Sequence, residues 1–482
     1  MNIDPLRRQS LISLVSASTL TFVGFIATMY FAHVLGKAAY GAYALFLAYY
    51  GIFSLIADGG FGGAAVKRIS EGREQDEYYS AFCALRIALL AVSIAALLLV
   101  RPLMIDLEAS GMVIWLFVAL VAGVLPGIIT TGVYGTDMVG VNQTAALINT
   151  IVKVAVQIVA VYLGYSASGL AGGCIAGIAT GGLFCLPFIT LRLTRFTKEH
   201  LKNLFTFSFW VFLSGSGAVI FSYADTILVG YFLSTADVGL YQIAVQFTAA
   251  ATFTTMALRT TLYPKISRWH AESKTGFIRH SLSRAFTYSL LLAVPVAVGG
   301  WILGERLLYF FYGAGFAEGS GALAILLLVQ VVNVFMFLQT MSLSAMGRPK
   351  ESFYATGTAA VVNIALDLTL IPLMGIEGAA VATLITMLVN ATIAYHYLSK
   401  QIPVQIERGP TLHILFAAGV MAVVIILYQH FIPLSNAFLV LAAVAIGAMV
   451  YGLILLKTDS SLHDEIHDLV VELGVPWPRW LW

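Results

Sequence analysis

Long apolar stretches, each about the length of a membrane-spanning helix, recur along the whole sequence. A helix needs about 20 apolar residues to cross the hydrocarbon core of a bilayer. Apolar runs bounded by charged or turn residues predict about fourteen such spans. They lie near residues 11–35, 39–62, 80–100, 111–134, 144–163, 168–191, 206–230, 237–261, 284–303, 320–343, 354–372, 376–398, 412–431 and 435–456. Because backbone polar groups in a bilayer must be satisfied within the span, the runs predict an all-α integral membrane protein.

The composition indicates the same class. Of the 482 residues, 60% are hydrophobic and only 10% are charged, whereas soluble domains carry about 25% charged residues. The 26 basic and 24 acidic residues nearly balance, so we expect no nucleic-acid partner. The three cysteines all lie inside apolar runs, which disfavours a metal site or a disulfide framework.

Basic residues are distributed unevenly among the connections between spans. Twenty of the 26 lysines and arginines fall in alternate connections on one side, and only Lys37, Arg101 and Arg306 fall on the other. Because cytoplasmic connections carry the excess of Lys and Arg, both termini are predicted in the cytoplasm, which requires an even number of spans. We therefore expect a multi-pass protein of the cell (cytoplasmic) membrane. The outer connections are short, which argues against a catalytic domain outside the membrane.

Two cytoplasmic segments mix basic and large apolar side chains. Residues 264–282 have the pattern expected of a helix lying on an anionic leaflet. The tail from 459 to 482 has apolar residues at helical spacing followed by tryptophans, which predicts an amphipathic helix at the headgroup level. Anchoring to the membrane surface accounts for both segments.

The sequence resembles itself across a distance of six spans. Residues 32–48 align with residues 230–246, and residues 145–153 align with residues 359–367. Since six is an even number, the two halves share one topology and are related by a pseudo-two-fold axis along the membrane normal. A cavity between two such lobes opens to alternate sides when one lobe rocks against the other.

This repeat predicts three regions. They are an N-terminal six-helix lobe (1–198), a C-terminal six-helix lobe (199–400), and two additional transmembrane helices with the cytoplasmic amphipathic tail (401–482). Within the repeat, Arg86 and Arg284 take the same place at the cytoplasmic starts of their spans.

Three segments resemble a known family. They are LGKAAYGAYAL (35–45), LIADGGFGGAAVKRIS (55–70) and residues 343–386, which include a Gly-Arg-x-Lys, Asn, Pro-x-x-Gly-Ile-x-Gly-Ala-Ala series. The series comprises Gly347, Arg348, Lys350, Asn363, Pro372, Gly375, Ile376, Gly378, Ala379 and Ala380. These segments resemble the polysaccharide transporter family. It is the lipid-linked oligosaccharide (O-antigen) flippase branch of the multidrug/oligosaccharidyl-lipid/polysaccharide exporter superfamily.

The resemblance implies a substrate and a route. It implies transport of undecaprenyl- or dolichyl-(pyro)phosphate-linked glycans from the cytoplasmic to the outer leaflet, through a cationic central cavity. The implied partners are this lipid-linked glycan, membrane lipids, and a glycan polymerase or glycosyltransferases of the same pathway. The lipid II flippase belongs to a sister family, so a peptidoglycan precursor stays open as the substrate.

Basic residues within or at the ends of spans are candidates for binding an anionic substrate. They are Arg86, Lys153, Arg259 and Arg284. Ionisable groups inside a membrane cost at least about 2.5–3.5 kcal/mol and usually face a cavity or a partner. Lys153 lies too deep in its span to reach the interface easily, and it offers a point charge to a diphosphate. A structural ion pair with Asp367 or Asp225 is the alternative, and for the three arginines it is snorkelling to the interface.

Acidic residues of the spans have two interpretations each. Asp367, Asp225 and Asp58 are candidates for binding a coupling ion, Na+ or H+, or for ion pairs. Asp58 precedes a glycine-rich stretch that is not followed by Gly-Lys-Ser/Thr, so we interpret the stretch as a hinge or packing element. Asn149 and Asn363 would form interhelical hydrogen bonds or meet sugar hydroxyls in the cavity.

The sequence contains no ATP-binding or hydrolase motif. We therefore expect no enzyme activity, no metal and no cofactor, and transport energy from an ion gradient, the membrane potential or product removal. The first hypothesis is a flippase that works by alternating access. A cation-coupled multidrug exporter of the related extrusion (MATE) type, a lipid II flippase and a membrane glycan polymerase or transferase are the alternatives. Because the candidate cavity groups are mostly basic, an anionic substrate is favoured.

Overall fold

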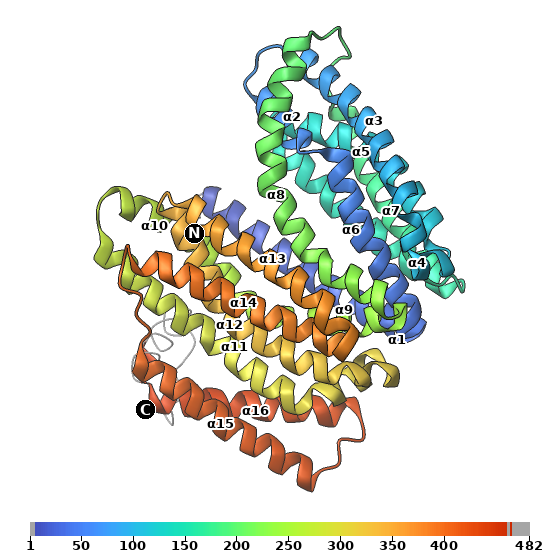
Figure 1. Ribbon diagram of the computed structural model, residues 1–482. Coiled ribbons are helices and arrows are strands. Elements are labelled where there is room, and N and C mark those ends of the chain that lie inside the picture. Colours follow the sequence, from blue (N-terminus) through green and yellow to red (C-terminus); the bar gives the residue numbers. More distant parts are fainter. Residues whose placement is uncertain (1–4, 460–462, 465–482) are drawn as a thin grey trace. The chain divides into compact units, whose positions relative to one another are not determined.

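The computed structural model describes residues 5–459 and 463–464 (Figure 1). Every regular element in these residues is a helix. Eleven of the described helices are long and apolar enough to cross a membrane. The all-helical membrane fold is thereby confirmed, and the count of fourteen spans stays a prediction.

The chain divides into two compact units, Met1–Gly239 and Leu240–Trp482. The division falls inside helix α9 (Thr235–Thr248). The lobes expected at 1–198 and 199–400, and the axis relating them, stay predictions.

The first unit is built from eight helices and two short 3₁₀ turns among its described residues, and it includes the start of α9. They are α1 (Pro5–Asp58), α2 (Phe61–Ser70), α3 (Gln75–Val100), η1 (Arg101–Leu103), α4 (Ile105–Ala109), α5 (Met112–Gly135), α6 (Val139–Tyr162), α7 (Ala167–Cys185), η2 (Leu186–Phe188) and α8 (Lys198–Phe232). Helix α1 passes through Gly36, whose backbone is not helical (φ 75°, ψ 173°). Only glycine adopts this φ without strain, so the chain breaks there, between the apolar runs predicted near 11–35 and 39–62.

Helix α8 packs against α1 within the first unit (Figure 1). A Cβ atom on Gly51 of α1 would overlap the Tyr223 ring of α8. Glycine at this point therefore allows the α1 backbone and an α8 side chain to approach closely.

The second unit contains the rest of α9 and the following described elements. They are η3 (Ala249–Thr252), α10 (Phe253–Ala271), α11 (Thr275–Tyr312), η4 (Ala314–Gly319), α12 (Ser320–Ala345), α13 (Pro349–Met374), α14 (Ile376–Ser399), α15 (Arg408–Phe431) and α16 (Ala437–Thr458). Helices α15 and α16 pack against α11, where the Tyr451 hydroxyl donates to the Leu291 carbonyl at 2.9 Å. The tail predicted as an amphipathic helix lies mostly outside the described residues.

The prediction of one surface helix over residues 264–282 is wrong. The segment is the end of α10 and the start of α11, joined by a turn in which Ser273 has a left-handed backbone (φ 56°). Ile266 and Ile278 are fully buried in the core of the second unit. Ile266 and Ile278 therefore pack inward across a helical hairpin, whereas Phe277 is exposed.

Candidate functional site

Helices α6 and α7 of the first unit approach each other along a glycine stripe. Glycines recur every fourth residue of α7, at Gly169, Gly173, Gly177 and Gly181. A Cβ atom on Gly177 would lie 2.5 Å from the Asn149 side-chain oxygen and 2.9 Å from the Lys153 Cβ atom. The stripe thus makes room for Asn149 and Lys153, which lie one turn apart on α6.

Lys153 lies near the middle of α6 and is half-buried. Within its own unit, Lys153 forms no ion pair with a described residue. The structural pair with Asp225, one of the two alternatives from the sequence, is therefore absent from this part of the chain. A cation in the middle of an apolar span without a paired carboxylate is costly unless an anion or water reaches it.

The surroundings of Lys153 are polar but uncharged. One turn along α6, the buried Gln157 side-chain amide donates to the Tyr43 hydroxyl of α1 at 2.9 Å and to the Leu170 carbonyl of α7 at 2.8 Å. The Cys174 thiol of α7 lies within electrostatic range of Lys153. Helices α1, α6 and α7 are thus tied together beside the lysine.

A second cation of the first unit is already paired. Arg86 of α3 donates to the Asp58 carboxylate at the end of α1, and the two side chains are 13% and 34% exposed. A Cβ on Gly127 of α5 would lie 3.2 Å from the other terminal nitrogen of Arg86. The guanidinium therefore lies against bare backbone, and its Nε atom is buried and forms no hydrogen bond with a described residue.

Glycines after Asp58 form a turn that packs against α8. Gly59 and Gly60 have left-handed backbones (φ 57° and 75°) and separate α1 from α2. A Cβ on Gly60 would lie 2.6 Å from the Ser208 carbonyl oxygen of α8. Any side chain at Gly60 would therefore push these helices apart, as expected of a packing element.

Sequence reasoning missed a tyrosine beside Arg86. Tyr50 lies within electrostatic range of Arg86, and a Cβ on Gly123 would lie 2.9 Å from the Tyr50 hydroxyl. Tyr43, Phe46 and Tyr50 also stack along one face of α1, with ring centroids 6.1 Å apart in each step. The signal available in the sequence was the i, i+3, i+7 spacing of these aromatic residues.

The second unit buries an acid and several polar side chains on the packed helices α13 and α14. Asp367 and Asn363 on α13 are fully buried, and so is Thr386 on α14, while Asn390 of α14 is 4% exposed. The Asn363 amide atoms, the Thr386 hydroxyl and the Asn390 carbonyl oxygen form no hydrogen bonds with described residues. A buried carboxylate requires a compensating cation, proton or hydrogen-bond set, and Asp367 interacts with a further residue of the chain.

The remaining candidates are Arg259, Arg284 and Asp225. Arg259 on α10 is exposed, and its guanidinium lies 5.8 Å from the Phe337 ring centroid. Arg284 on α11 and Asp225 on α8 are half-buried, and each interacts with another residue. No group of His, Cys, Asp and Glu suited to a metal ion occurs in the described residues.

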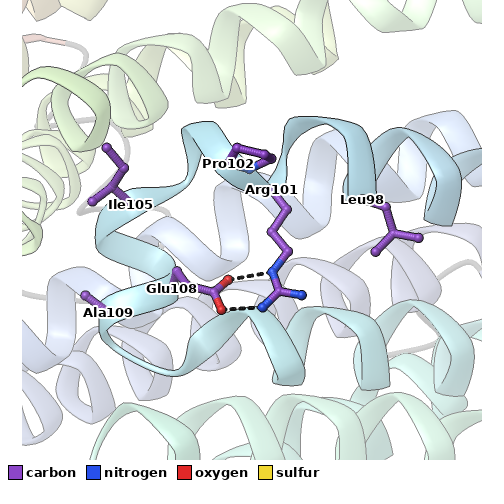
Figure 2. A pocket seen from close by; sticks show the side chains of 6 residues that line it. All are labelled: Leu98, Arg101, Pro102, Ile105, Glu108 and Ala109. Carbon is purple, nitrogen blue, oxygen red and sulfur yellow. Dashed lines mark hydrogen bonds and ion pairs between the residues drawn. The ribbon is translucent and has the colours of Figure 1, made fainter.

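A pocket of about 480 Å³ lies at the end of α3 (Figure 2). Its lining residues are Leu98, Arg101, Pro102, Ile105, Glu108 and Ala109. None of the predicted site residues lines this pocket.

Solved structures define the class of the fold. The chain is similar to the lipid II flippase MurJ in an inward closed conformation, with a TM-score of 0.77, 18% identity, and coverage of 95% of this chain and 100% of that one. It is also similar to an inward-facing multidrug resistance MATE family transporter of the MOP superfamily. There the TM-score is 0.63 and the identity 15%, over 79% of this chain and 94% of that one. The fold is that of multi-pass membrane transporters of this kind.

The family follows from sequence comparison. Residues 31–321 match the family described as Polysaccharide biosynthesis protein, and the chain belongs to this family. It is 27% identical over 475 residues to the probable flippase AglR of Haloferax volcanii, covering 97% of this chain and 99% of that protein. It is 26% identical over 432 residues to the probable low-salt glycan biosynthesis flippase Agl15 of the same organism, covering 90% and 92%. The family resemblance in the sequence is confirmed.

Proposed function

We propose that the protein is a flippase that moves polyprenyl-(pyro)phosphate-linked oligosaccharide from the cytoplasmic to the outer leaflet, for surface-glycan synthesis. The family is a polysaccharide biosynthesis family, and its relatives AglR and Agl15 are named as flippases and not as enzymes. The observation that carries the proposal is Lys153, a cation in the middle of a span without a carboxylate partner in its unit.

An anionic headgroup satisfies Lys153 better than a neutral one. In a medium of low effective dielectric constant, the attraction between an ammonium and a phosphate is several times stronger than in water. Asn149 supplies an amide group one turn from the lysine, and such groups bind sugar hydroxyls well. The glycine stripe of α7 lets this face of α6 pack closely, and Lys153 is the charged residue on that face.

Arg86 provides a second, exchangeable cation. Its partner Asp58 is one third exposed, so a phosphate can replace this carboxylate without leaving a deeply buried charge behind. The buried Arg86 Nε donor has no acceptor among the described residues. A substrate phosphate that takes up this donor would regain a hydrogen bond worth about 1.5–3 kcal/mol.

Asp367 is the proposed coupling group. Its carboxylate is buried one turn along α13 from the buried Asn363 amide, which gives a polar site for Na+ or a protonation site for H+. Binding of the cation in one conformation and its release in the other would supply directionality for alternating access.

The test is transport by the full-length protein in proteoliposomes. Radiolabelled polyprenyl-diphosphate oligosaccharide from the source cell, lipid II and a cationic dye would be offered separately. The proposal predicts leaflet transfer of the lipid-linked oligosaccharide and its loss in Lys153→Gln, while Lys457→Gln at the exposed end of α16 transports normally. Transfer of lipid II or dye alone would contradict it.

A further inference from the structure

The end of α3 carries an ion pair, Arg101–Glu108, that the proposed transport cycle does not use. After Val100 the chain turns through η1, with Pro102, and folds back as the short helix α4. This turn brings Arg101 against Glu108. The Arg101 Nε atom donates to one Glu108 carboxylate oxygen at 2.9 Å, and Nη2 donates to the other at 2.5 Å. The two bonds fix the plane of the guanidinium.

The ion pair lies in the pocket of Figure 2, and the other walls of the pocket are apolar. Leu98 is 53% exposed and Ile105 is 72% exposed, although both are large aliphatic side chains. At the end of a transmembrane helix, such exposure is stable when lipid chains cover the side chains. The pocket therefore combines a hydrocarbon surface with a charged group at headgroup depth.

The guanidinium keeps hydrogen-bonding capacity beyond the ion pair. Arginine has five N–H donors, and the bonds to Glu108 use one on each of Nε and Nη2. The Nη1 atom forms no hydrogen bond with a described residue, and Figure 2 shows the third guanidinium nitrogen directed away from Glu108. Hydrogen bonding from Arg101 also lowers the pKa of Glu108, so the carboxylate stays ionised at neutral pH.

We propose that this pocket binds one phospholipid of the bilayer, with the phosphate on Arg101 and an acyl chain along Leu98 and Ile105. Its volume of about 480 Å³ lies within the range of about 300–1,000 Å³ for small-molecule sites. A phosphate matches the unused donors of Arg101. The distribution of basic residues predicts this end of α3 on the outer side, so the lipid belongs to the outer leaflet.

The test measures lipid retention by the purified full-length protein in detergent, by native mass spectrometry during titration with phosphatidylglycerol. Arg101→Gln should weaken binding about fivefold, because a basic residue at a membrane surface contributes about 1 kcal/mol. Arg306→Gln, which removes the other predicted outer arginine, is the matched control and should bind as the wild type does. Glu108→Gln should bind at least as tightly as the wild type, since the carboxylate that competes with phosphate is gone.

Three further probes separate the lipid from other occupants. Diacylglycerol has the same chains without the phosphate and should bind more weakly than phosphatidylglycerol. Equal binding of the two, or equal binding by Arg101→Gln and wild type, would overturn the proposal. Tight binding of polyprenyl phosphate without phosphatidylglycerol would assign the pocket to the transported lipid, and a dimer lost in Ile105→Gln would assign it to a second copy. Either result would contradict the proposed occupant.

Discussion

Helices α6 and α7 of the first unit align in sequence with α13 and α14 of the second, but the two pairs carry opposite charges. Asn149 and Lys153 on α6 correspond to Asn363 and Asp367 on α13. Lys153 is half-buried, whereas Asp367 is fully buried. Part of the lysine side chain is thus exposed, whereas the acid is not.

Helices α7 and α14, which pack on α6 and α13, also differ in polarity. When Gly169 of α7 is aligned with Gly378 of α14, Gly177 corresponds to Thr386 and Gly181 to Asn390. The two α7 positions carry no side-chain oxygen, whereas the corresponding α14 positions carry a buried threonine and a buried asparagine. The two helix pairs therefore match the two proposed roles, an anion site in the first unit and a cation site in the second.

Charge reversal at Lys153 is expected to have the largest effect. Lys153→Glu should lower transport of lipid-linked oligosaccharide more than about hundredfold, because like charges facing each other cost several kcal/mol. Lys153→Arg should retain part of the activity, since the charge is kept and the geometry changes. Rates in proteoliposomes measure both. A Lys153→Glu variant that transports normally would remove the first helix pair from substrate binding.

Neutralising the acid of the second pair should act on coupling. Asp367→Asn should lower transport driven by an ion gradient about tenfold, in the range of typical coupling energies, and should abolish its dependence on the coupling ion. Gradient dependence equal to that of the wild type would contradict the cation role.

The glycine stripe can be tested by adding a single methyl group. Gly177→Ala would place a Cβ 2.5 Å from the Asn149 oxygen and should destabilise the protein by about 1–3 kcal/mol. Gly172→Ala on the same helix is the control, since its Cβ would lie 3.5 Å from the Trp115 ring. The control should be neutral or stabilised by up to about 1 kcal/mol through helix propensity. Equal melting temperatures for the two variants would mean that close packing at Gly177 is not required.

The smallest effect is expected for the exposed Arg101–Glu108 ion pair, which lies outside both helix pairs. The hydrogen bond from Arg101 lowers the pKa of Glu108 in the folded protein. A depressed pKa contributes stability above the unfolded value, near 4.3 for Glu, and the contribution is lost as the pH falls through the folded value. Glu108→Gln should therefore lower the melting temperature slightly at pH 7 and not at pH 3. A larger loss at pH 3 than at pH 7 would contradict the assigned direction.

Apolar runs predicted the helices well, because span length is fixed by the bilayer and the break at Gly36 is marked by its residue type. The segment 264–282 was misassigned because a surface helix and the tip of a helical hairpin have the same composition. They differ only in the turn at Ser273 and in the burial of Ile266 and Ile278.

The candidate charges could be listed from the sequence but not paired. Asp58 and Arg86 are separated by α2 and by the turn that follows it, so no local spacing links them. The unpaired state of Lys153 within its unit depends on which groups surround it in space, and the sequence does not contain that information.

Affinity for the substrate headgroup tests the division of roles most directly. Binding of polyprenyl-diphosphate oligosaccharide to the purified protein would be measured for the wild type, Lys153→Gln and Asp367→Asn at saturating and zero Na+, and at two pH values. We expect Lys153→Gln to weaken binding about tenfold or more, because it removes a hydrogen bond to a charged group. Asp367→Asn should leave the affinity measured without the coupling ion unchanged. The reverse pattern, with affinity lost in Asp367→Asn and kept in Lys153→Gln, would contradict it.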